Sequence, residues 1–415
     1  MALISCLHVS LLAYCQKDAG VASKHMLQQL LTEQVIPNPT ANATPVDYPQ
    51  CRQAAVSYVM NVFPSNDCTS RFILLAACSD KNEDIRSLAS RNLFQEQNDN
   101  YPEFQSLLKL ILANAHGDYP MGRQTLVYHP KTYQEMIYYL HRCLIRQSFN
   151  GEKNTPLWKY EEQLCVLHDI AKIDTKIWYN YIQFLLDFVL VVHDCLSTYF
   201  LLEAVIVGYH LNDQQLRDLF HEHLSSFRQL CLFSTRDDTR RYGSLLYARV
   251  LSNEDSSRSA IDELMKIIPN INQRFEQREA SIIAVAYVCS YLDSSNEYVT
   301  QGKAILLRLY FDHQNEFLPA LLIGIGQLAR RNRFNEGDES NIQALIEQLK
   351  GKLRTINETN RMKEKAIQTL GFLAVCYRNQ SEKLIDILTQ TLVDTKQIEL
   401  QLNVGKAESD ISFCL

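Results

Sequence analysis

The 415-residue sequence contains little glycine and proline. The two residue types account for 13 and 11 positions, or about 6% of the chain, against roughly 12% in average proteins. A β-sandwich or barrel needs a turn every ~8–12 residues and therefore many turn-forming residues. The scarcity of these residues argues against an all-β fold, and it argues equally against collagen-like, mucin-like and wholly disordered chains.

The sequence also lacks a basic block and a Cys-x-x-Cys pair. Lysine and arginine number 41 against 47 aspartates and glutamates, and the two signs are interspersed along the chain. We therefore expect no nucleic-acid partner. The twelve cysteines lie mostly in apolar stretches, as Cys78, Cys289 and Cys376 do, which is typical of free, buried thiols in a reducing compartment.

No long uncharged apolar run is present. The most apolar stretch, 178–208, is interrupted by Asp187 and Glu203, among others, and it predicts two buried helices rather than a membrane span. The apolar N-terminus has no Lys or Arg before Lys17 and no clear cleavage site, so it does not resemble a signal peptide. We expect a soluble, cytoplasmic chain without a membrane span.

Helical periodicity runs through the sequence. Apolar residues recur at three- and four-residue spacing, which places them on one stripe of a helix. The clearest stripes are Ile85, Leu88 and Ala89; Ile282, Ala286, Cys289 and Leu292; Leu321, Ile325 and Leu328; and Ala366, Leu370 and Leu373. The one short extended candidate is 125–128. An all-α fold is therefore predicted.

Similar helices return at regular intervals. Most begin with a charged residue, continue with small and apolar residues, and close on a bulky apolar residue; they start at Arg52, Asp84, Arg240, Arg278, Pro319 and Lys363. From Arg240 the starts lie 38, 41 and 44 residues apart, near the period of about 40–47 residues of HEAT repeats. This predicts a HEAT-type α-solenoid of antiparallel helix hairpins that stack into a superhelical arc. Small residues such as Ala286, Gly324 and Gly371 would let neighbouring helices approach closely.

Breaks in this pattern suggest a division of the chain. We expect HEAT-like repeats over 1–115, an irregular insertion or linker with one helix over 116–160, further HEAT-like repeats over 161–404, and a frayed tail over 405–415.

Several motifs could carry chemistry, but each has a structural interpretation that we favour. Gly324–Ala329 matches the G-x-G-x-x-A dinucleotide fingerprint, yet its helical spacing and the preceding Pro319 predict the inside of a helix rather than a phosphate-binding turn. His221 and His223 are two residues apart, so on a helix they point away from each other and cannot share a metal ion.

One further set could bind zinc. Cys165, His168, His193 and Cys195 are all nitrogen or sulfur donors, but the segment between them lacks zinc-ribbon turn chemistry. Residues 138–141 (Tyr-Tyr-Leu-His) predict core packing. Because no Gly-x-Ser-x-Gly or framed Cys–His arrangement is present, we assign no catalytic, cofactor-binding or metal-binding residue and expect a protein that is not an enzyme.

Eight segments of the sequence occur in a characteristic order: 52–56, 62–66, 70–77, 80–93, 201–205, 324–329, 363–372 and 393–405. As an ordered set they resemble a known family, the HEAT-repeat proteasome adapter and scaffold proteins. The resemblance implies a helical solenoid that binds the 26S proteasome, bridges its core and regulatory particles, and aids its assembly, quality control and localisation, including endoplasmic-reticulum-associated degradation. It implies residence in the cytoplasm and also in the nucleus and at the endoplasmic reticulum and endosomes, with partners associated with vesicles or the reticulum. Family members are several times longer, so the chain resembles an internal stretch.

Two alternatives stay open. The first is another HEAT-repeat adaptor, of the nuclear transport receptor or vesicle-coat type. The second is a helical enzyme that uses the zinc set between Cys165 and Cys195.

Overall fold

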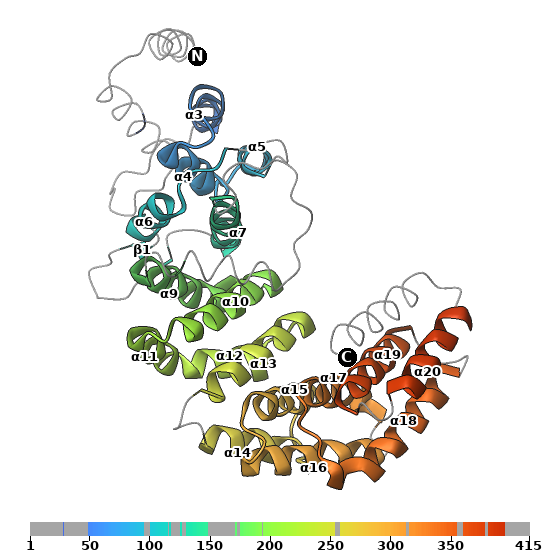
Figure 1. Ribbon diagram of the computed structural model, residues 1–415. Coiled ribbons are helices and arrows are strands. Elements are labelled where there is room, and N and C mark those ends of the chain that lie inside the picture. The colour runs from blue at the N-terminus through green and yellow to red at the C-terminus, as the bar shows by residue number, and fades with distance from the viewer. Residues whose placement is uncertain are drawn as a thin grey trace. The chain divides into compact units, whose positions relative to one another are not determined.

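The computed structural model describes most of the chain (Figure 1). The described residues are 28, 49–94, 100–114, 116–117, 125–126, 130–147, 171, 175–192, 194–253, 258–312, 315–354, 360–377 and 381–394. The chain forms two compact units, unit 1 (Met1–Leu219) and unit 2 (Phe220–Leu415), and their boundary falls within helix α11 (Gln214–Glu222). Helices dominate the described parts of both units, so the predicted all-α fold is confirmed.

Unit 1 contains the helices before that boundary and one small hairpin. Its elements are α3 (Pro49–Val62), α4 (Cys68–Ala77), α5 (Glu83–Leu93), α6 (Phe104–Asn114), β1 (His116–Gly117), β2 (Thr125–Leu126), α7 (Pro130–Gln147), α9 (Thr175–Val192), α10 (Cys195–Leu211) and the first part of α11. Strands β1 and β2 pair antiparallel. The extended candidate at 125–128 is therefore a strand over its first two residues, whereas its partner at 116–117 was not predicted.

Side-chain caps fix where several of these helices begin. Asp67 accepts a hydrogen bond from the backbone N–H of Ser70 at the start of α4, and Asp194 does the same for Ser197 at the start of α10. Such caps satisfy backbone donors that have no partner inside the helix. Asp194 separates α9 from α10, which confirms the two helices predicted over 178–208. No described helix is both long enough and apolar enough to cross a membrane.

The core of unit 1 is rich in aromatic side chains. Tyr133 of α7 stacks on Phe188 of α9 with ring centroids 4.1 Å apart, and Phe104 of α6 meets Tyr181 edge-on. Trp178 is buried and donates its Nε1–H to the carbonyl of Ala204 at 3.2 Å. Large rings of this kind supply much of the apolar area that a core buries.

Unit 2 repeats one arrangement of helices. Its elements after α11 are α12 (Leu224–Phe233), α13 (Asp237–Leu251), α14 (Arg258–Ile267), α15 (Phe275–Tyr291), α16 (Glu297–Phe311), η2 (Asn315–Phe317), α17 (Leu318–Arg330), η3 (Glu336–Asp338), α18 (Glu339–Arg354), α19 (Asn360–Cys376) and α20 (Ser381–Asp394). Helices α13, α15, α17 and α19 pack one on the next, and we call them the stacked row (Figure 1). The remaining helices flank this row. The predicted stacking of helix hairpins is confirmed within unit 2.

The helices of the stacked row run parallel to one another. The side chains of Arg240 and Glu279 meet near the N-terminal ends of α13 and α15, and Arg249 lies over the Tyr291 ring near their C-terminal ends. Equivalent contacts join α17 to its neighbours on both sides. The regularly spaced starts at Arg240, Arg278, Pro319 and Lys363 all fall in the first turns of these four helices.

Small residues allow the close contacts of the row, as predicted. A Cβ atom on Gly324 of α17 would lie 2.9 Å from the Cβ of Ala286 in α15, closer than side-chain carbons pack. The predicted apolar stripes point inward, with Ile282, Leu321 and Leu370 fully buried. Unit 2 therefore has one continuous core along the row.

The expected four-part division of the chain stays a prediction. Within 116–160 the structure describes the hairpin and one helix, α7, which packs on α4, α6, α9 and α10 as part of unit 1. Residues 148–160, which end the expected insertion or linker, and the tail at 405–415 lie outside the described residues.

Candidate functional site

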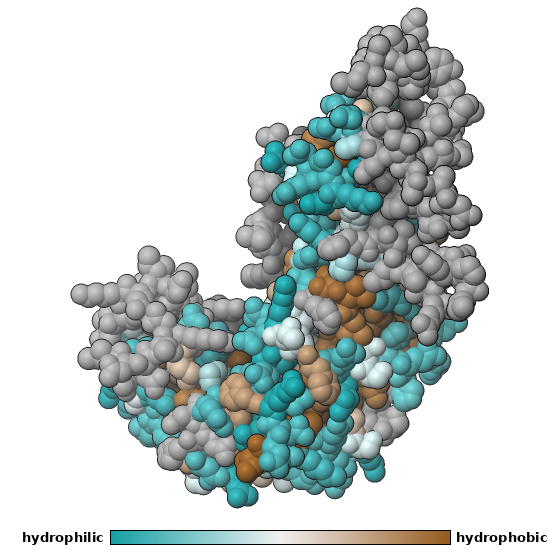
Figure 2. Space-filling model, turned by 180° about the vertical axis from the view of Figure 1, so that it is seen from behind, coloured by the Kyte–Doolittle hydropathy of each residue, from teal (hydrophilic) through white to brown (hydrophobic). Residues whose placement is uncertain are grey.

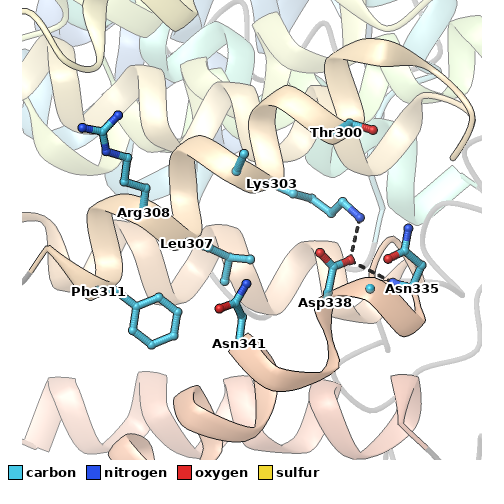
Figure 3. A pocket seen from close by; sticks show the side chains of 10 residues that line it. Thr300, Lys303, Leu307, Arg308, Phe311, Asn335, Asp338 and Asn341 are labelled. Atoms are coloured by element: carbon cyan, nitrogen blue, oxygen red, sulfur yellow. Dashed lines mark hydrogen bonds and ion pairs between the residues drawn. The ribbon is translucent and has the colours of Figure 1, made fainter.

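A pocket of about 490 Å³ opens in unit 2 between α16 and the turn that leads into α18 (Figure 3). Helix α16 supplies one wall, and the segment from 335 to 341 supplies the other. The lining residues are Thr300, Lys303, Ala304, Leu307, Arg308, Phe311, Asn335, Gly337, Asp338 and Asn341. Charged side chains from both walls line the pocket.

Lys303 and Asp338 form the centre of the pocket. The Lys303 ammonium lies 2.7 Å from Asp338 Oδ2, and the side chains are only 7% and 17% exposed. The Asp338 carboxylate also accepts the backbone N–H of Asn335 at 2.9 Å, so it holds the turn before α18 in place. The side chain of Arg308 points away from this pair (Figure 3) and lies beside Asp312 on the surface.

Ion pairs of the same kind join successive helices elsewhere. In unit 1 Arg52 of α3 makes two hydrogen bonds to Asp80, at 2.6 and 3.1 Å. In unit 2 Arg240 lies 3.7 Å from Glu279, and Arg278 lies 3.6 Å from Glu316. Each pair links a helix to the next helical hairpin. The charge that opens the repeated motif at 52, 240 and 278 is therefore a structural link between neighbouring repeats.

The side chains that line the pocket limit the chemistry that it can perform. No His, Cys or Ser lines it, and its ammonium and carboxylate neutralise each other. A group that serves as a general base or nucleophile needs a free position from which to reach substrate. The carboxylate that lines the pocket is instead engaged by Lys303 and by the backbone N–H of Asn335.

The structure places the dinucleotide-like motif inside a helix, as predicted. Gly324–Ala329 belongs to α17, with Pro319 in its first turn, and all six residues are buried. Gly326 faces α19, where an added Cβ would lie 3.3 Å from the Phe372 ring. The glycines therefore serve helix packing and leave no space for a pyrophosphate.

The candidate metal ligands are not brought together among the described residues. His221 ends α11 on an exposed face, and His223 lies beyond that helix, at the start of α12. Of the proposed zinc set, Cys195 lies half-buried in α10, whereas Cys165, His168 and His193 lie outside the described residues. The described part of the chain holds no group of three or more potential metal ligands.

Sequence reasoning missed a buried polar cluster in unit 1. His141 of α7 stacks on Phe200 with ring centroids 3.5 Å apart, and its Nε2 lies 4.0 Å from Glu203 Oε2 of α10. Burial lowers the pKa of His141 to about 3, so the imidazole is neutral. Burial, and then the nearby Glu203, raise the pKa of Tyr181 in α9. Residues 138–141 were expected to be core, but nothing in that run indicated its carboxylate neighbour 62 positions later.

Large apolar side chains on the surface are few. Those exposed among the described residues are Leu196, Phe233, Ile271 and Phe275. On the face that Figure 2 shows, hydrophilic residues cover most of the coloured surface, and hydrophobic residues form separate patches.

Comparison with known proteins shows which proteins this chain resembles. The family model described as "Proteasome component ECM29, N-terminal" matches residues 3–77, and the model described as "ECM29, ARM-like repeats" matches residues 168–316. The chain is similar to ECM29 over these two stretches. The Homo sapiens "Proteasome adapter and scaffold protein ECM29" is 25% identical in an alignment that covers 86% of this chain and 22% of the human protein. The chain thus spans about a fifth of the length of this ECM29 relative.

Solved structures give weaker matches. Kap121p bound to RanGTP has a TM-score of 0.38 at 12% identity, over 94% of this chain and 37% of that chain. An engineered protein has a TM-score of 0.31 at 12% identity, over 93% of this chain and 99% of that chain. TM-scores this low support no conclusion about the fold or the function of this chain. The ARM-like repeat model and the described helices together support the solenoid fold, whereas the predicted superhelical arc stays a prediction.

Proposed function

We propose that the chain is a non-enzymatic scaffold that associates with the proteasome. The observation that carries the proposal is the match of two ECM29 models, in the order N-terminal segment and then ARM-like repeats, on a chain built from stacked helices. A stack of repeats offers an extended surface, on which binding energy is spread over many contacts.

The chemistry of the described residues supports a scaffold rather than an enzyme. The buried charges found in the candidate pocket and at the repeat boundaries are engaged in ion pairs. The buried cysteines are deprived of reactivity, since burial raises the pKa of Cys78, Cys231 and Cys289 to about 12. A thiol with a raised pKa is a poor nucleophile at neutral pH.

The finer roles extend this proposal. By its similarity to the human adapter and scaffold, the chain would contact both the core and the regulatory particle and aid assembly, quality control and localisation. Residence in the cytoplasm and nucleus, and at the endoplasmic reticulum and endosomes, together with contacts to proteins of those membranes, belongs to the same proposal.

Affinity capture from lysate tests the proposal. The tagged chain is expected to retain proteasome subunits of both particles in the presence of ATP. A Leu370→Ala variant, which weakens the core of the stacked row, serves as a folding-dependent control. Retention of a Ran-type GTPase or of coat proteins without proteasome subunits would contradict the proposal and favour the alternative adaptor classes.

A further inference from the structure

The stacked row carries a cluster of arginine and aromatic side chains at the C-terminal ends of its helices. Arg249 of α13 and Arg331 after α17 both lie over the Tyr291 ring of α15, at 4.9 and 5.9 Å from the guanidinium carbon to the ring centroid. Arg330 lies 5.7 Å over the Phe372 ring of α19. Cation–π contacts of this kind hold a guanidinium in place without neutralising its charge.

Two further residues belong to the same cluster. Tyr287 lies one turn before Tyr291, with ring centroids 6.4 Å apart. Arg241 of α13 and Arg330 of α17 both lie close enough to Tyr287 to oppose the rise in its pKa that burial causes. All four helices of the stacked row, together with the residue after α17, thus contribute to one surface, which we call the arginine–tyrosine face. It consists of Arg241, Arg249, Tyr287, Tyr291, Arg330, Arg331 and Phe372.

Three of the four arginines of this face lack a carboxylate partner among the described residues. Arg241, Arg330 and Arg331 are exposed, and none of the three forms an ion pair with a described carboxylate. Elsewhere in unit 2, Arg240, Arg278 and Lys303 each have a carboxylate within 4 Å. The turn after α15 carries Asp293, whose carboxylate accepts hydrogen bonds from the backbone N–H and the hydroxyl of Ser295.

The loop that carries Arg331 is fixed in place. Asn332 adopts a left-handed backbone conformation with φ of 53° and accepts a hydrogen bond from the Cys376 thiol. Arg333 donates two hydrogen bonds to the carbonyl of Ser290, at 3.2 and 3.1 Å. Because this surface is already fixed in place, it loses less conformational entropy when a partner binds to it.

We infer that the arginine–tyrosine face binds an acidic peptide segment of a partner protein. Carboxylates of such a segment would pair with the exposed guanidinium groups, and its apolar side chains would contact the Tyr291 and Phe372 rings. A long polyanion fits less well, because acidic residues lie in the first turns of two of these helices. They are Asp237 and Asp238 of α13, four and three residues before Arg241, and Glu276 of α15. This inference concerns the chemistry of a partner and does not require that the partner be the proteasome.

Fluorescence anisotropy on the full chain tests the inference. The probe is a fluorescein-labelled peptide that alternates Glu-Asp pairs with single Leu residues. We expect saturable binding that weakens as salt is added, and a loss of affinity of about tenfold or more in the triple variant Arg241→Gln, Arg330→Gln, Arg331→Gln. The matched variant Arg258→Gln, Lys266→Gln, Arg354→Gln removes the same charge from exposed positions on α14 and α18 and should bind like the wild type.

Two further probes separate acidic protein segments from other anions. A single-stranded RNA of equal charge and vesicles of anionic lipid should bind more weakly than the peptide. Preference for RNA or vesicles, equal binding by both triple variants, or no binding of the peptide by the wild type would each overturn the inference. If proteasome subunits are captured while the peptide fails to bind, this inference falls and the proposed function stands.

Discussion

The two units bring their helices together by different means. Unit 1 fills its core with large rings, such as the stacked pair of Tyr133 and Phe188 and the buried Trp178. Unit 2 brings helix backbones close at small residues, as at Gly243 and Gly324. Arginine links between repeats occur in both units. Small residues bring two helices together only where they face each other at a definite spacing, whereas aromatic rings can fill gaps of irregular shape between helices. The regular spacing in the sequence is accordingly clearest in unit 2.

The largest effect is expected from truncation of the repeat core. Leu370 of α19 is fully buried within unit 2, and Leu370→Ala should lower the free energy of unfolding by ~2–5 kcal/mol through lost burial and a cavity. Hydrogen exchange should show the loss in α17 and α19. The exposed Thr389→Ala in α20 is the control, and an unchanged thermal melt for Leu370→Ala would mean that this stripe does not face the core.

A close helix contact should show the next largest effect. A Cβ atom on Gly243 of α13 would lie 2.6 Å from the backbone carbonyl of Leu230 in α12. Gly243→Ala should therefore destabilise unit 2 by about 3 kcal/mol, because backbone cannot yield as a side chain can.

Gly351 of α18 provides the matched control for this contact. No atom lies within 4 Å of an added Cβ there, so Gly351→Ala should stabilise the helix by up to about 1 kcal/mol through helix propensity. Equal denaturant midpoints for Gly243→Ala and Gly351→Ala would show that close packing of helix backbones is not what distinguishes unit 2 from unit 1.

Acid should act on unit 1 through His141. Its pKa is about 3 in the folded chain, whereas an unfolded histidine titrates near ~6.5. Between these values only the unfolded state binds the proton, so the stability that this group contributes is complete above pH ~6.5 and falls by about 1.4 kcal/mol per pH unit below it.

The variant His141→Phe isolates this effect, because a phenyl ring can retain the stacking on Phe200. Its α7 and α10 should lose less protection from hydrogen exchange between pH 7 and 5 than those of the wild type. His221→Phe, at an exposed position of α11, is the control. The same pH dependence in all three proteins would contradict the assignment.

The smallest effect is expected from a single link between repeats. Arg278 donates to the carbonyl of Ile268 at 2.9 Å, lies 3.6 Å from Glu316 and lies over the Phe317 ring. Arg278→Gln should cost about 1 kcal/mol. Arg308→Gln removes an exposed pair on α16 and should change the unfolding free energy by much less. If both variants melt alike, the arginine links do not stabilise the stack.

Much of unit 2 could be predicted from the sequence because its signals are local. The stripe of Leu321, Ile325 and Leu328 lies within one helix, and the starts at Arg240 and Arg278 are visible as a repeated pattern. The role of the arginines in joining repeats could not be predicted, since the carboxylates Glu279 and Glu316 lie 38 or more positions away and carry no mark in the sequence.

The candidate site was less predictable, because its residues also come from segments that are distant in sequence. The pair of Lys303 and Asp338 and the cluster around Tyr291 each combine helices that are distant in sequence. A helix stripe predicts which residues are buried, but it does not predict which exposed arginines of neighbouring helices share one surface. His141 and Glu203 illustrate the same limit in unit 1. The position of His141 on a buried helix does not indicate which residue lies beside it.

Sedimentation velocity with purified 26S proteasomes tests the proposed scaffold role most directly. The labelled full chain should move with the proteasome at a fixed stoichiometry, without being consumed or modified, and an excess of unlabelled chain should displace it. A labelled chain that sediments alone at every proteasome concentration, under conditions in which the human ECM29 relative co-sediments, would contradict the account.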